Sequence, residues 1–314
     1  MTDLVLVADI GGTNTRVALA RSRALDTSSI RRYANAQAAG FGEVLQRYLS
    51  EIDLDRAALS GACAAGAGPV RHGSVTLTNL DWKISPDLLR DTLSVPRVSV
   101  LNDLQAQGHA IGFAAANQVV EVVPHPPAAP DATKLVVGVG TGFNAAPVIE
   151  TEAGRVVMPS EAGHISLPSV GAAADRVIAY LTKTFGFADV EEALSGRGIS
   201  QVHAALHGTP KPAQEVMAAL DAGDGEAQET VRMVVQLLGA VVGDLALITL
   251  PKGGIYLVGG VTRNLAPWLE PFGFAEAMAA KGRFGKFVAQ FGVSLVADDY
   301  AALAGCAAHL AEIA

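Results

Sequence analysis

Apolar residues fall into short runs along the first hundred residues, and their spacing alternates between the periods of strands and of helices. Runs near 4–8, 16–21, 30–34, 58–64 and 74–77 have the length and the bounds of strands. Between them, Phe41, Val44, Leu45 and Tyr48 are spaced by three and four residues, which predicts an amphipathic helix over 41–50. A further strand, VSVLN, precedes a helix over 104–112. The pattern therefore predicts an α/β domain.

The rest of the chain carries longer helical patterns and further strands. Helices are predicted near 171–185, 189–194, 199–206, 212–220 and 225–249, and the buried strand GIYLVGG is followed by a helix near 262–269. The loop VVPHPPAAPDAT is typical either of a linker or of a surface excursion. We expect a small α/β domain formed by residues 1–110 and about 299–314, and a large α/β domain formed by 111–298. The C-terminal small-residue helix would then pack back on the first domain.

One sequence motif occurs twice: an apolar strand ends in a Gly/Thr turn, and a second strand follows the turn. The copies are LVLVADIGGTNTRVALA, from Leu4 to Ala20, and LVVGVGTGFNAAPVIE, from Leu135 to Glu150. Glycines let a backbone approach an anion and turn N–H groups toward it, and threonine adds a hydroxyl. The expected phosphate contacts are Gly11, Gly12 and Thr13 in one turn and Gly140, Thr141 and Gly142 in the other.

Neither turn matches a Walker A loop or a dinucleotide fingerprint, both of which lead into a helix. Each copy alone is equally typical of an ordinary hairpin. The pair, with Asp9 at the end of the first strand, favours a nucleotide held in a cleft between two related halves.

Composition restricts the classes of partner. The formal net charge of −8 argues against a general nucleic-acid surface, so local amides, hydroxyls and metal would have to hold an anionic nucleotide. Cys63 and Cys306 lack metal-ligand spacing, and we interpret them as buried free thiols. The N-terminus has no signal-peptide pattern and no apolar run reaches the length of a membrane span, so we expect a cytoplasmic protein without a membrane partner.

Several polar residues are candidates for chemistry. Asp103 follows the strand VSVLN, at the edge where α/β sheets bind ligands, so its carboxylate is a candidate general base for an alcohol, with Asn102 as a hydrogen-bonding neighbour. Either residue is equally suited to capping the following helix. Glu161 and His164 lie three residues apart in a glycine-containing loop and suit adjacent sugar hydroxyls, although such a pair is often structural. Other histidines, such as His203 and His207, are interpreted as surface residues.

Eight segments in fixed order resemble bacterial glucokinase of the hexokinase/actin-like ATPase superfamily: DIGGTNTRVAL, TNLDW, LNDLQAQGHAIG, VGTGF, PSEAGHISL, EEALSGRGIS, YLVGGVTRN and KGRFGKFV. The resemblance covers nearly the whole chain. It implies a two-lobed actin-like ATPase (ribonuclease H-like) fold, each lobe a mixed sheet flanked by helices, with the active site in the interlobe cleft. It also implies ATP-dependent phosphorylation of the 6-hydroxyl of glucose with Mg²⁺, in a homodimer that binds no nucleic acid.

The resemblance assigns roles to individual residues. Asp103 matches the catalytic base, and the sugar-binding positions match Asn102, Glu161, His164 and Glu191, with Asn79 as a further contributor. Asp9 matches the acid that orients hydrated Mg²⁺. The nucleotide positions match Gly11, Gly12, Thr13, Asn14, Gly140, Thr141, Gly142 and, on the adenosine side, Gly259 and Gly260.

One departure from the family pattern lies beside the second turn. Where the pattern usually continues GTGLG, this chain has Asn144 in place of the last glycine, and asparagine tolerates left-handed conformations better than other non-glycine residues. The cysteine-rich zinc motif of the related repressor/kinase group is absent from the sequence.

Other functions remain open at this point. They are a kinase for another hexose or for an N-acetylated amino sugar, a non-catalytic sugar-sensing regulator, and an actin-like ATPase without a small substrate.

Overall fold

The computed structural model describes residues 3–68, 70–77, 80–113 and 118–313. Residue contacts divide the chain into two units. The first unit comprises Met1–Ala114, Thr151–Pro159 and Asp298–Ala314, and the second comprises Ala115–Glu150 and Ser160–Ala297. The segment Thr151–Pro159 therefore belongs to the first unit, unlike in the bounds expected from sequence, and the division into a small and a large domain stays a prediction.

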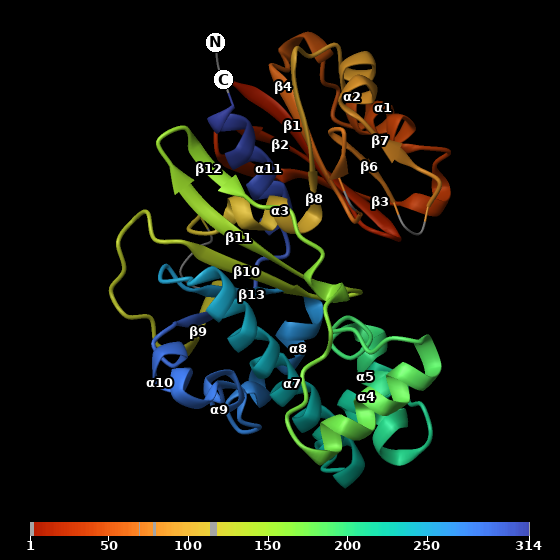
Figure 1. Cartoon of the computed structure of the whole chain (residues 1–314). Helices are drawn as coiled ribbons and strands as arrows, with labels where there is room; N and C mark the ends of the chain where they lie inside the picture. The colour runs from red at the N-terminus through yellow and green to blue at the C-terminus, as the bar shows by residue number, and fades with distance from the viewer. Residues whose placement is uncertain (1–2, 69, 78–79, 114–117, 314) are drawn as a thin grey trace. The chain divides into compact units, whose positions relative to one another are not determined.

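The first unit contains a five-stranded sheet in the order β3-β2-β1-β4-β8 and a small sheet in the order β5-β6-β7 (Figure 1). Strands β1, β4 and β8 are parallel, whereas β2 and β3 extend the sheet antiparallel through the β1–β2 hairpin. The elements of this unit are β1 Leu4–Ile10, β2 Asn14–Arg21, β3 Ala24–Ala34, α1 Phe41–Glu51, β4 Gly61–Gly66, β5 Val70–Arg71, β6 Ser74–Thr76, β7 Lys83–Ile84, α2 Pro86–Leu93, β8 Arg97–Asn102, α3 Asp103–Ala110, β12 Gly154–Val157 and α11 Ala301–Glu312.

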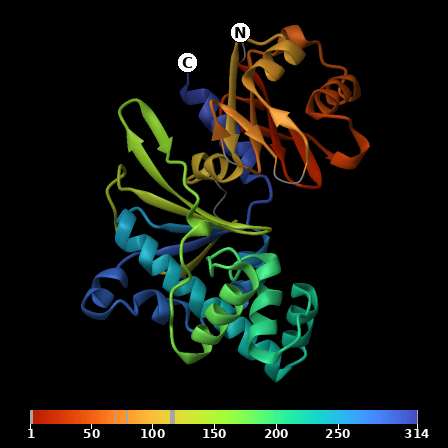
Figure 2. The same ribbon diagram turned by 45° about the vertical axis from the view of Figure 1, so that its right-hand side comes forward.

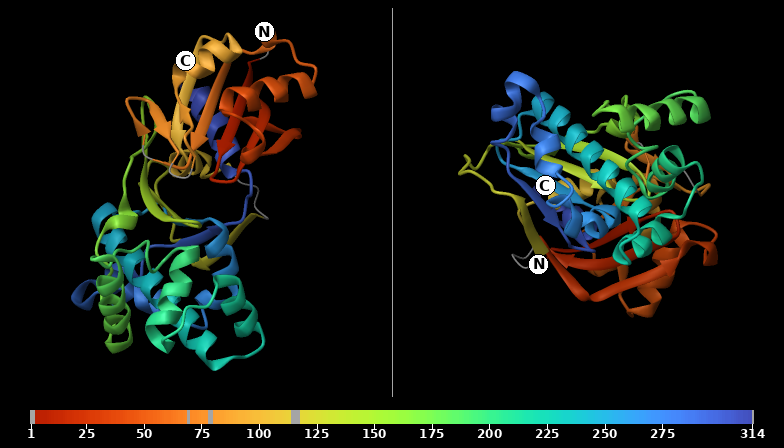
Figure 3. Two further views of the ribbon diagram at one scale, coloured as in Figure 1. Left: turned by 90° about the vertical axis from the view of Figure 1, so that its right-hand side faces the viewer. Right: turned by 90° about the horizontal axis from the view of Figure 1, so that it is seen from below.

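Both faces of this five-stranded sheet are covered, so β1 is apolar at almost every position. Leu6 and Ile10 pack with α1 and α2 in one cluster, and Val5 and Val7 pack with α11 in another. Figure 3 shows helix α11, in blue, alongside the red strands of this sheet. The C-terminal helix α11 thus packs on the first sheet, as the sequence predicts. Gly305 lets α11 approach α3 closely, because a Cβ at this position would collide with the Ala106 carbonyl.

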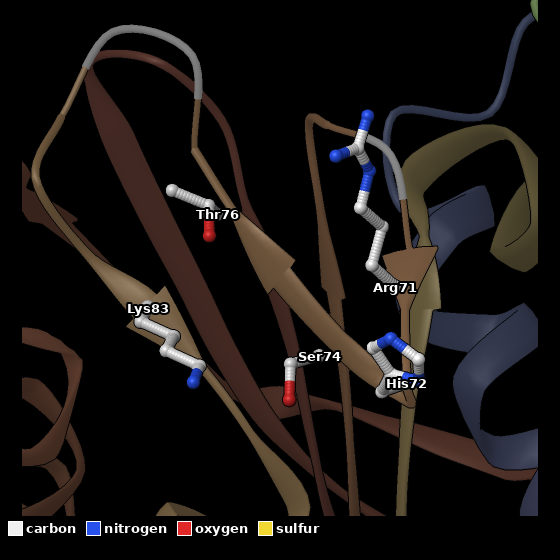
Figure 4. Close-up of a pocket in the computed structure, with 5 residues that line it drawn as sticks. All are labelled: Arg71, His72, Ser74, Thr76 and Lys83. Atoms are coloured by element: carbon white, nitrogen blue, oxygen red, sulfur yellow. The ribbon is translucent and has the colours of Figure 1, made fainter.

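The small sheet of the first unit is amphipathic. Val75 and Ile84 lie on its buried face, and strand register puts Arg71, Ser74, Thr76 and Lys83 on the opposite face. With His72, these four residues line a cavity of about 350 Å³ (Figure 4). None of the candidate site residues within the described ranges is among these lining residues.

The second unit contains a sheet in the order β12-β11-β10-β13-β14-β9, in which β12 follows β11 through a hairpin and clusters with the first unit. Strands β10, β13 and β14 are parallel, and β11 and β9 are antiparallel to their neighbours. Helices α4 to α7 follow one another along the chain in this unit (Figure 2). Its elements are β9 Val119–Val123, β10 Lys134–Val139, β11 Phe143–Thr151, α4 Ala172–Phe185, α5 Gly196–His207, α6 Ala213–Asp221, α7 Gly225–Thr249, β13 Ile255–Val258, α8 Gly260–Leu269, α9 Phe274–Ala279, α10 Gly285–Val288 and β14 Val293–Val296.

Helix α7 is the central helix of the second unit's apolar cluster, with Val231, Val235, Leu238 and Val242 buried. Contrary to the sequence expectation about apolar runs, α7 is long and apolar enough to span a membrane by length and composition. Of its most apolar window, 72% is buried inside the fold, which is typical of a core helix.

Three local expectations from sequence were wrong or incomplete. Residues 189–194 form turns instead of a helix, because the backbone N–H groups of Val190 and Glu191 donate to Ile165 and Gly163 rather than to a preceding helical turn. His203 is buried instead of exposed, and its Nδ1 lies 2.8 Å from the Thr209 carbonyl oxygen. Helices α2, α9 and α10 were not predicted. Cys63 and Cys306 are buried free thiols, as expected.

Candidate active site

The carboxyl ends of the parallel strands in the first unit meet at one edge of the sheet. The register pairs Ile10 with Gly66 and Gly66 with Asn102, so the three strands end side by side. Asp9 lies one residue before the end of β1, and Asp103 directly follows β8. Because α/β sheets bind ligands at this edge, the topology brings together two carboxylates that are far apart in the sequence.

The start of helix α3 separates the roles of Asn102 and Asp103. Asn102 is the N-cap: its Oδ1 accepts the Leu104 N–H at 2.9 Å, and Gln105 completes a capping box by accepting the Asn102 N–H at 3.1 Å. The Asn102 Nδ2 donates to the Gly68 carbonyl at 3.0 Å, which leaves one amide hydrogen for a ligand. Capping thus falls to Asn102, and Asp103 is the first helical residue.

The Asp103 carboxylate has an environment suited to accepting a proton. The pKa of Asp103 is raised from 3.8 to about 6: burial raises it most, the Leu104 N–H lowers it, and the nearby Asp9 charge raises it. That N–H lies 2.8 Å from the Asp103 Oδ1. A carboxylate with a pKa of about 6 is mostly ionised at neutral pH and is a better base than an ordinary aspartate.

Asp9 is paired with a residue that the sequence did not single out. Arg16 lies opposite Asp9 in the β1–β2 register, and its Nη1 is 3.3 Å from the Asp9 Oδ2. Burial raises the pKa of Asp9, and the Arg16 guanidinium opposes that rise. Among the described residues, no group of three or more histidines, cysteines and acids has the arrangement of a metal centre.

The first Gly/Thr turn, between β1 and β2, is fixed from the side by Asn35. The Asn35 Nδ2 donates to the Gly11 carbonyl at 2.8 Å, and its Oδ1 accepts the buried Thr15 hydroxyl at 2.8 Å. The Asn35 N–H donates to the Thr13 carbonyl at 2.9 Å. These bonds occupy the carbonyl groups of Gly11 and Thr13, while Gly12 and Thr13 remain accessible to solvent. Asn14, the next residue, begins β2 and donates to the Thr13 hydroxyl at 2.8 Å.

The second turn, between β10 and β11, is fixed by its own backbone and by α5. The Gly140 N–H donates to the Gly142 carbonyl at 2.9 Å, and the Gly196 N–H at the start of α5 donates to the Gly140 carbonyl at 2.8 Å. Thr141 is exposed at the tip of the turn. Both predicted hairpins therefore exist, and the turn of each is held by hydrogen bonds from residues outside the hairpin.

Glu191 lies directly against the second turn. Its Oε2 accepts the Phe143 N–H at 3.0 Å, and its Oε1 is 2.8 Å from Arg197 Nη2. A Cβ at Gly142 would lie 2.5 Å from the Glu191 Oε2, so a side chain at this position would displace the carboxylate from its present place. The structure thus brings a candidate sugar residue into contact with a candidate phosphate turn, a proximity that sequence spacing does not reveal.

The loop that carries Glu161 and His164 lies beside the start of β11, and both side chains are exposed. The His164 Nδ1 is 3.3 Å from the Asp189 Oδ2, which directs the other ring nitrogen, Nε2, away from the carboxylate. Asn144 contacts the same loop through its side-chain amide. Asn144 is in a strand and does not have a positive φ, so tolerance of left-handed conformations is not the reason for its presence.

Gly259 and Gly260 lie between β13 and α8, next to the second turn. Gly259 has a φ of 104°, and a Cβ there would collide with the carbonyl of Val139, the last residue of β10. The two glycines and Gly140 thus follow neighbouring parallel strands. Asn79 lies outside the described residues.

Sequence reasoning missed four polar residues that hold these groups in place: Arg16, Asn35, Asp189 and Arg197. A weak signal exists only for Arg16, which follows the first Gly/Thr turn by three residues. The other partners are brought close by tertiary folding.

Comparison with known proteins identifies the architecture. The structure resembles the crystal structure of glucokinase from an Antarctic psychrotroph with a TM-score of 0.86 and 31% identity, covering 99% of each chain. It also resembles the ROK hexokinase of Thermus thermophilus with a TM-score of 0.68, covering 97% of each chain, although at 21% identity this likeness concerns the fold alone. The fold is therefore the two-lobed actin-like ATPase fold of the sugar kinases.

The sequence comparisons narrow this class to one family. A family model described as glucokinase matches residues 6–313. The glucokinase of Chromohalobacter salexigens is 32% identical over the full length of both chains, and that of Cupriavidus metallidurans is 32% identical over 98% of this chain and 93% of its own. The chain belongs to the glucokinase family, and it is a sugar phosphotransferase for which the family implies ATP as a substrate.

Proposed function

We propose that the protein transfers the γ-phosphoryl group of ATP to the 6-hydroxyl of glucose. Membership of the glucokinase family over nearly the whole chain supports the reaction. The observation that carries the residue assignment is Asp103, a carboxylate with a raised pKa at the carboxyl edge of the first sheet. Cytoplasmic location and a homodimeric state are parts of the same proposal.

In this proposal, the residues of the first unit act on the acceptor and on one phosphate. The Asp103 carboxylate accepts the proton of the 6-hydroxyl as the oxygen–phosphorus bond forms and the bond to ADP breaks. The remaining amide hydrogen of Asn102 binds a sugar hydroxyl. Gly11, Gly12, Thr13 and Asn14 form the first phosphate turn: the Gly11 N–H closes it by donating to the Asn14 carbonyl, and the N–H groups of Gly12 and Thr13 donate to phosphate oxygens. Asn35 holds the carbonyl groups of Gly11 and Thr13.

The residues of the second unit orient the sugar and the remaining phosphates. Glu161, His164 and Glu191 accept or donate hydrogen bonds to sugar hydroxyls, and Asp189 holds the ring of His164 in one orientation. Gly140, Thr141 and Gly142 form the second phosphate turn: the Gly140 N–H closes it by donating to the Gly142 carbonyl, and Thr141 and Gly142 bind phosphate through backbone N–H groups and the Thr141 hydroxyl. Gly259 and Gly260 let the backbone approach the adenosine part.

The residues present suit Mg²⁺. Asp9 supplies one hard oxygen ligand on a partly exposed carboxylate, and Mg²⁺ typically binds through one or two carboxylates, several waters and the substrate phosphates. We assign Asp9 to the hydrated Mg²⁺. The metal, when bound, would neutralise negative charge on the transferring phosphoryl group.

The test is a coupled assay of ADP release with Mg-ATP across glucose, mannose, fructose, N-acetylglucosamine and N-acetylmannosamine, with a control that lacks sugar. We expect sugar-dependent ADP release that is strongest with glucose and that falls by a factor of about 10² to 10⁴ in Asp103→Asn. Phosphorus NMR of the product identifies the phosphorylated hydroxyl.

Turnover only with another sugar would make the protein a kinase of that sugar, with the fold unchanged. The fold alone is shared with a putative N-acetylmannosamine kinase from Listeria monocytogenes at 17% identity, so the sugar panel includes that acceptor. No sugar-dependent turnover, combined with sugar binding, would favour a non-catalytic regulator.

A further inference from the structure

The side chain of Asn144 forms a hydrogen-bonded clamp on the loop that carries Glu161. Its Nδ2 donates to the Ser160 carbonyl at 2.7 Å, and its Oδ1 accepts the Ala162 N–H at 2.9 Å. The Ser160 hydroxyl lies 3.1 Å from the same Oδ1 and also donates to the Ala145 carbonyl. The clamp therefore grips the backbone on both sides of Glu161 and leaves the Glu161 side chain exposed.

The residue type fits this role closely. A carboxamide presents a donor and an acceptor from one rigid group, and both are used here on the same loop. An aspartate would keep the acceptor but would place a charge against the Ser160 carbonyl oxygen. Alanine or glycine would remove both bonds. Because Asn144 is in the extended conformation of a strand opposite Gly138, its backbone does not explain the choice of asparagine.

Asn144 is also well placed relative to the other candidate site residues. It follows Phe143, whose N–H is held by Glu191, and the Phe143 carbonyl lies so close to Gly163 that a Cβ there would collide with it. The Glu191 N–H donates to the Gly163 carbonyl at 2.9 Å. The first two residues of β11 thus hold Glu161 and Glu191, while the phosphate turn keeps its own Gly140–Gly142 bond without help from Asn144.

We propose that Asn144 is a positioning residue for the sugar, which acts by holding the Glu161 loop and which has no part in binding the nucleotide. This inference rests on the proposed function, because it takes Glu161 as a sugar contact. It goes beyond that function by assigning sugar affinity to a side chain that does not itself touch the sugar.

The test compares Asn144→Ala with the wild type in steady-state kinetics. We expect the KM for glucose to rise about 10-fold, since two hydrogen bonds that order the loop are lost, with a smaller decrease in kcat. The KM for ATP should stay within about 2-fold. Gln214→Ala, which removes an exposed carboxamide on α6 of the same unit, is the matched control and should leave both KM values unchanged.

A second measurement, amide hydrogen exchange, reports on the clamp independently of catalysis. Amide hydrogen exchange of the peptide that contains Ala162 should become faster in Asn144→Ala and stay protected in Gln214→Ala. Asn144→Asp should keep part of this protection, because the acceptor of the Ala162 N–H remains, while glucose KM rises.

The outcomes separate the two proposals. An unchanged glucose KM in Asn144→Ala, or equal increases in the KM values for glucose and ATP, would overturn the positioning role. Unchanged exchange at Ala162 would overturn the clamp itself. A wild-type protein that phosphorylates no sugar would overturn the proposed function and the role in sugar affinity together, and exchange would then still decide whether the clamp exists.

Discussion

Replacing Asp103 with asparagine should make the protein more stable and nearly inactive. The substitution keeps the shape of the side chain and an acceptor for the Leu104 N–H, and it removes the negative charge. That charge is costly in the folded state, because burial and the neighbouring Asp9 raise the pKa of Asp103 from 3.8 to about 6. Enzymes commonly hold a catalytic group in an environment that lowers the stability of the fold but raises the activity.

The size of the effect follows from the pKa. A rise of about 2 units corresponds to about 3 kcal/mol of unfolding free energy, as an upper bound. Because the folded pKa lies above the unfolded value, the folded state binds the proton more tightly. The contribution of this carboxyl to stability is therefore lost as pH rises from about 4 to 6, and the full cost of the charge is present above pH 6. Asp103→Asn should recover this cost at pH 8 and gain nothing at pH 4.

The assay is urea unfolding of the first unit at several pH values between 4 and 8. Trp82 is buried in that unit, so its fluorescence reports on the unit in a Trp268→Phe background, which removes the tryptophan of the second unit. In parallel, kcat/KM of the wild type should fall below an apparent pKa of about 6. A variant with no gain in stability at pH 8, or with activity near that of the wild type, would refute the assignment of Asp103 as a buried base.

Three further predictions concern the turns and the helix contact. Asn35→Ala should raise the KM for ATP more than that for glucose, because it frees the Gly11 carbonyl of the first phosphate turn; equal effects on both values would contradict this role. Gly142→Ala should raise the KM for glucose by displacing Glu191, and Gly140→Ala, which has nothing within 4 Å of its new Cβ, should do so less. Gly305→Ala should lower the free energy of unfolding of the first unit by about 3 kcal/mol in urea titrations, since its Cβ meets the backbone of α3; an unchanged midpoint would show that the helices separate freely.

Much of the fold could be predicted from periodicity. Helix α7 begins and ends at the predicted residues, and both Gly/Thr hairpins are present, because these segments have a strong local pattern that matches their final burial. The predicted helix over 189–194 fails for a tertiary reason. The Glu191 N–H donates to the Gly163 carbonyl, and the Glu191 carboxylate accepts the Phe143 N–H; these contacts outweigh local helix propensity.

The candidate site was only partly accessible from sequence. Asp103 was singled out by its position after a strand, but the competing interpretation as a helix cap was resolved only when Asn102 was found to fill that role. Asn144 departs from the family pattern, and the sequence indicates only that asparagine tolerates unusual backbone conformations; the structure shows instead that its side chain is hydrogen-bonded to residues 160–162.

The sequence by itself determined the elements, the two Gly/Thr turns and the resemblance to one family, because these depend on local spacing and on motifs in a fixed order. Only the tertiary structure decided which polar groups meet. The hydrogen-bonded pairs Asn35 and Gly11, and Glu191 and Phe143, and the electrostatically coupled pair Asp9 and Asp103 are separated by 24 to 94 residues in the chain. Strand register and loop packing bring them near one another. The raised pKa of Asp103 depends on the same register, since burial and the approach of Asp9 exist only once the parallel strands are aligned.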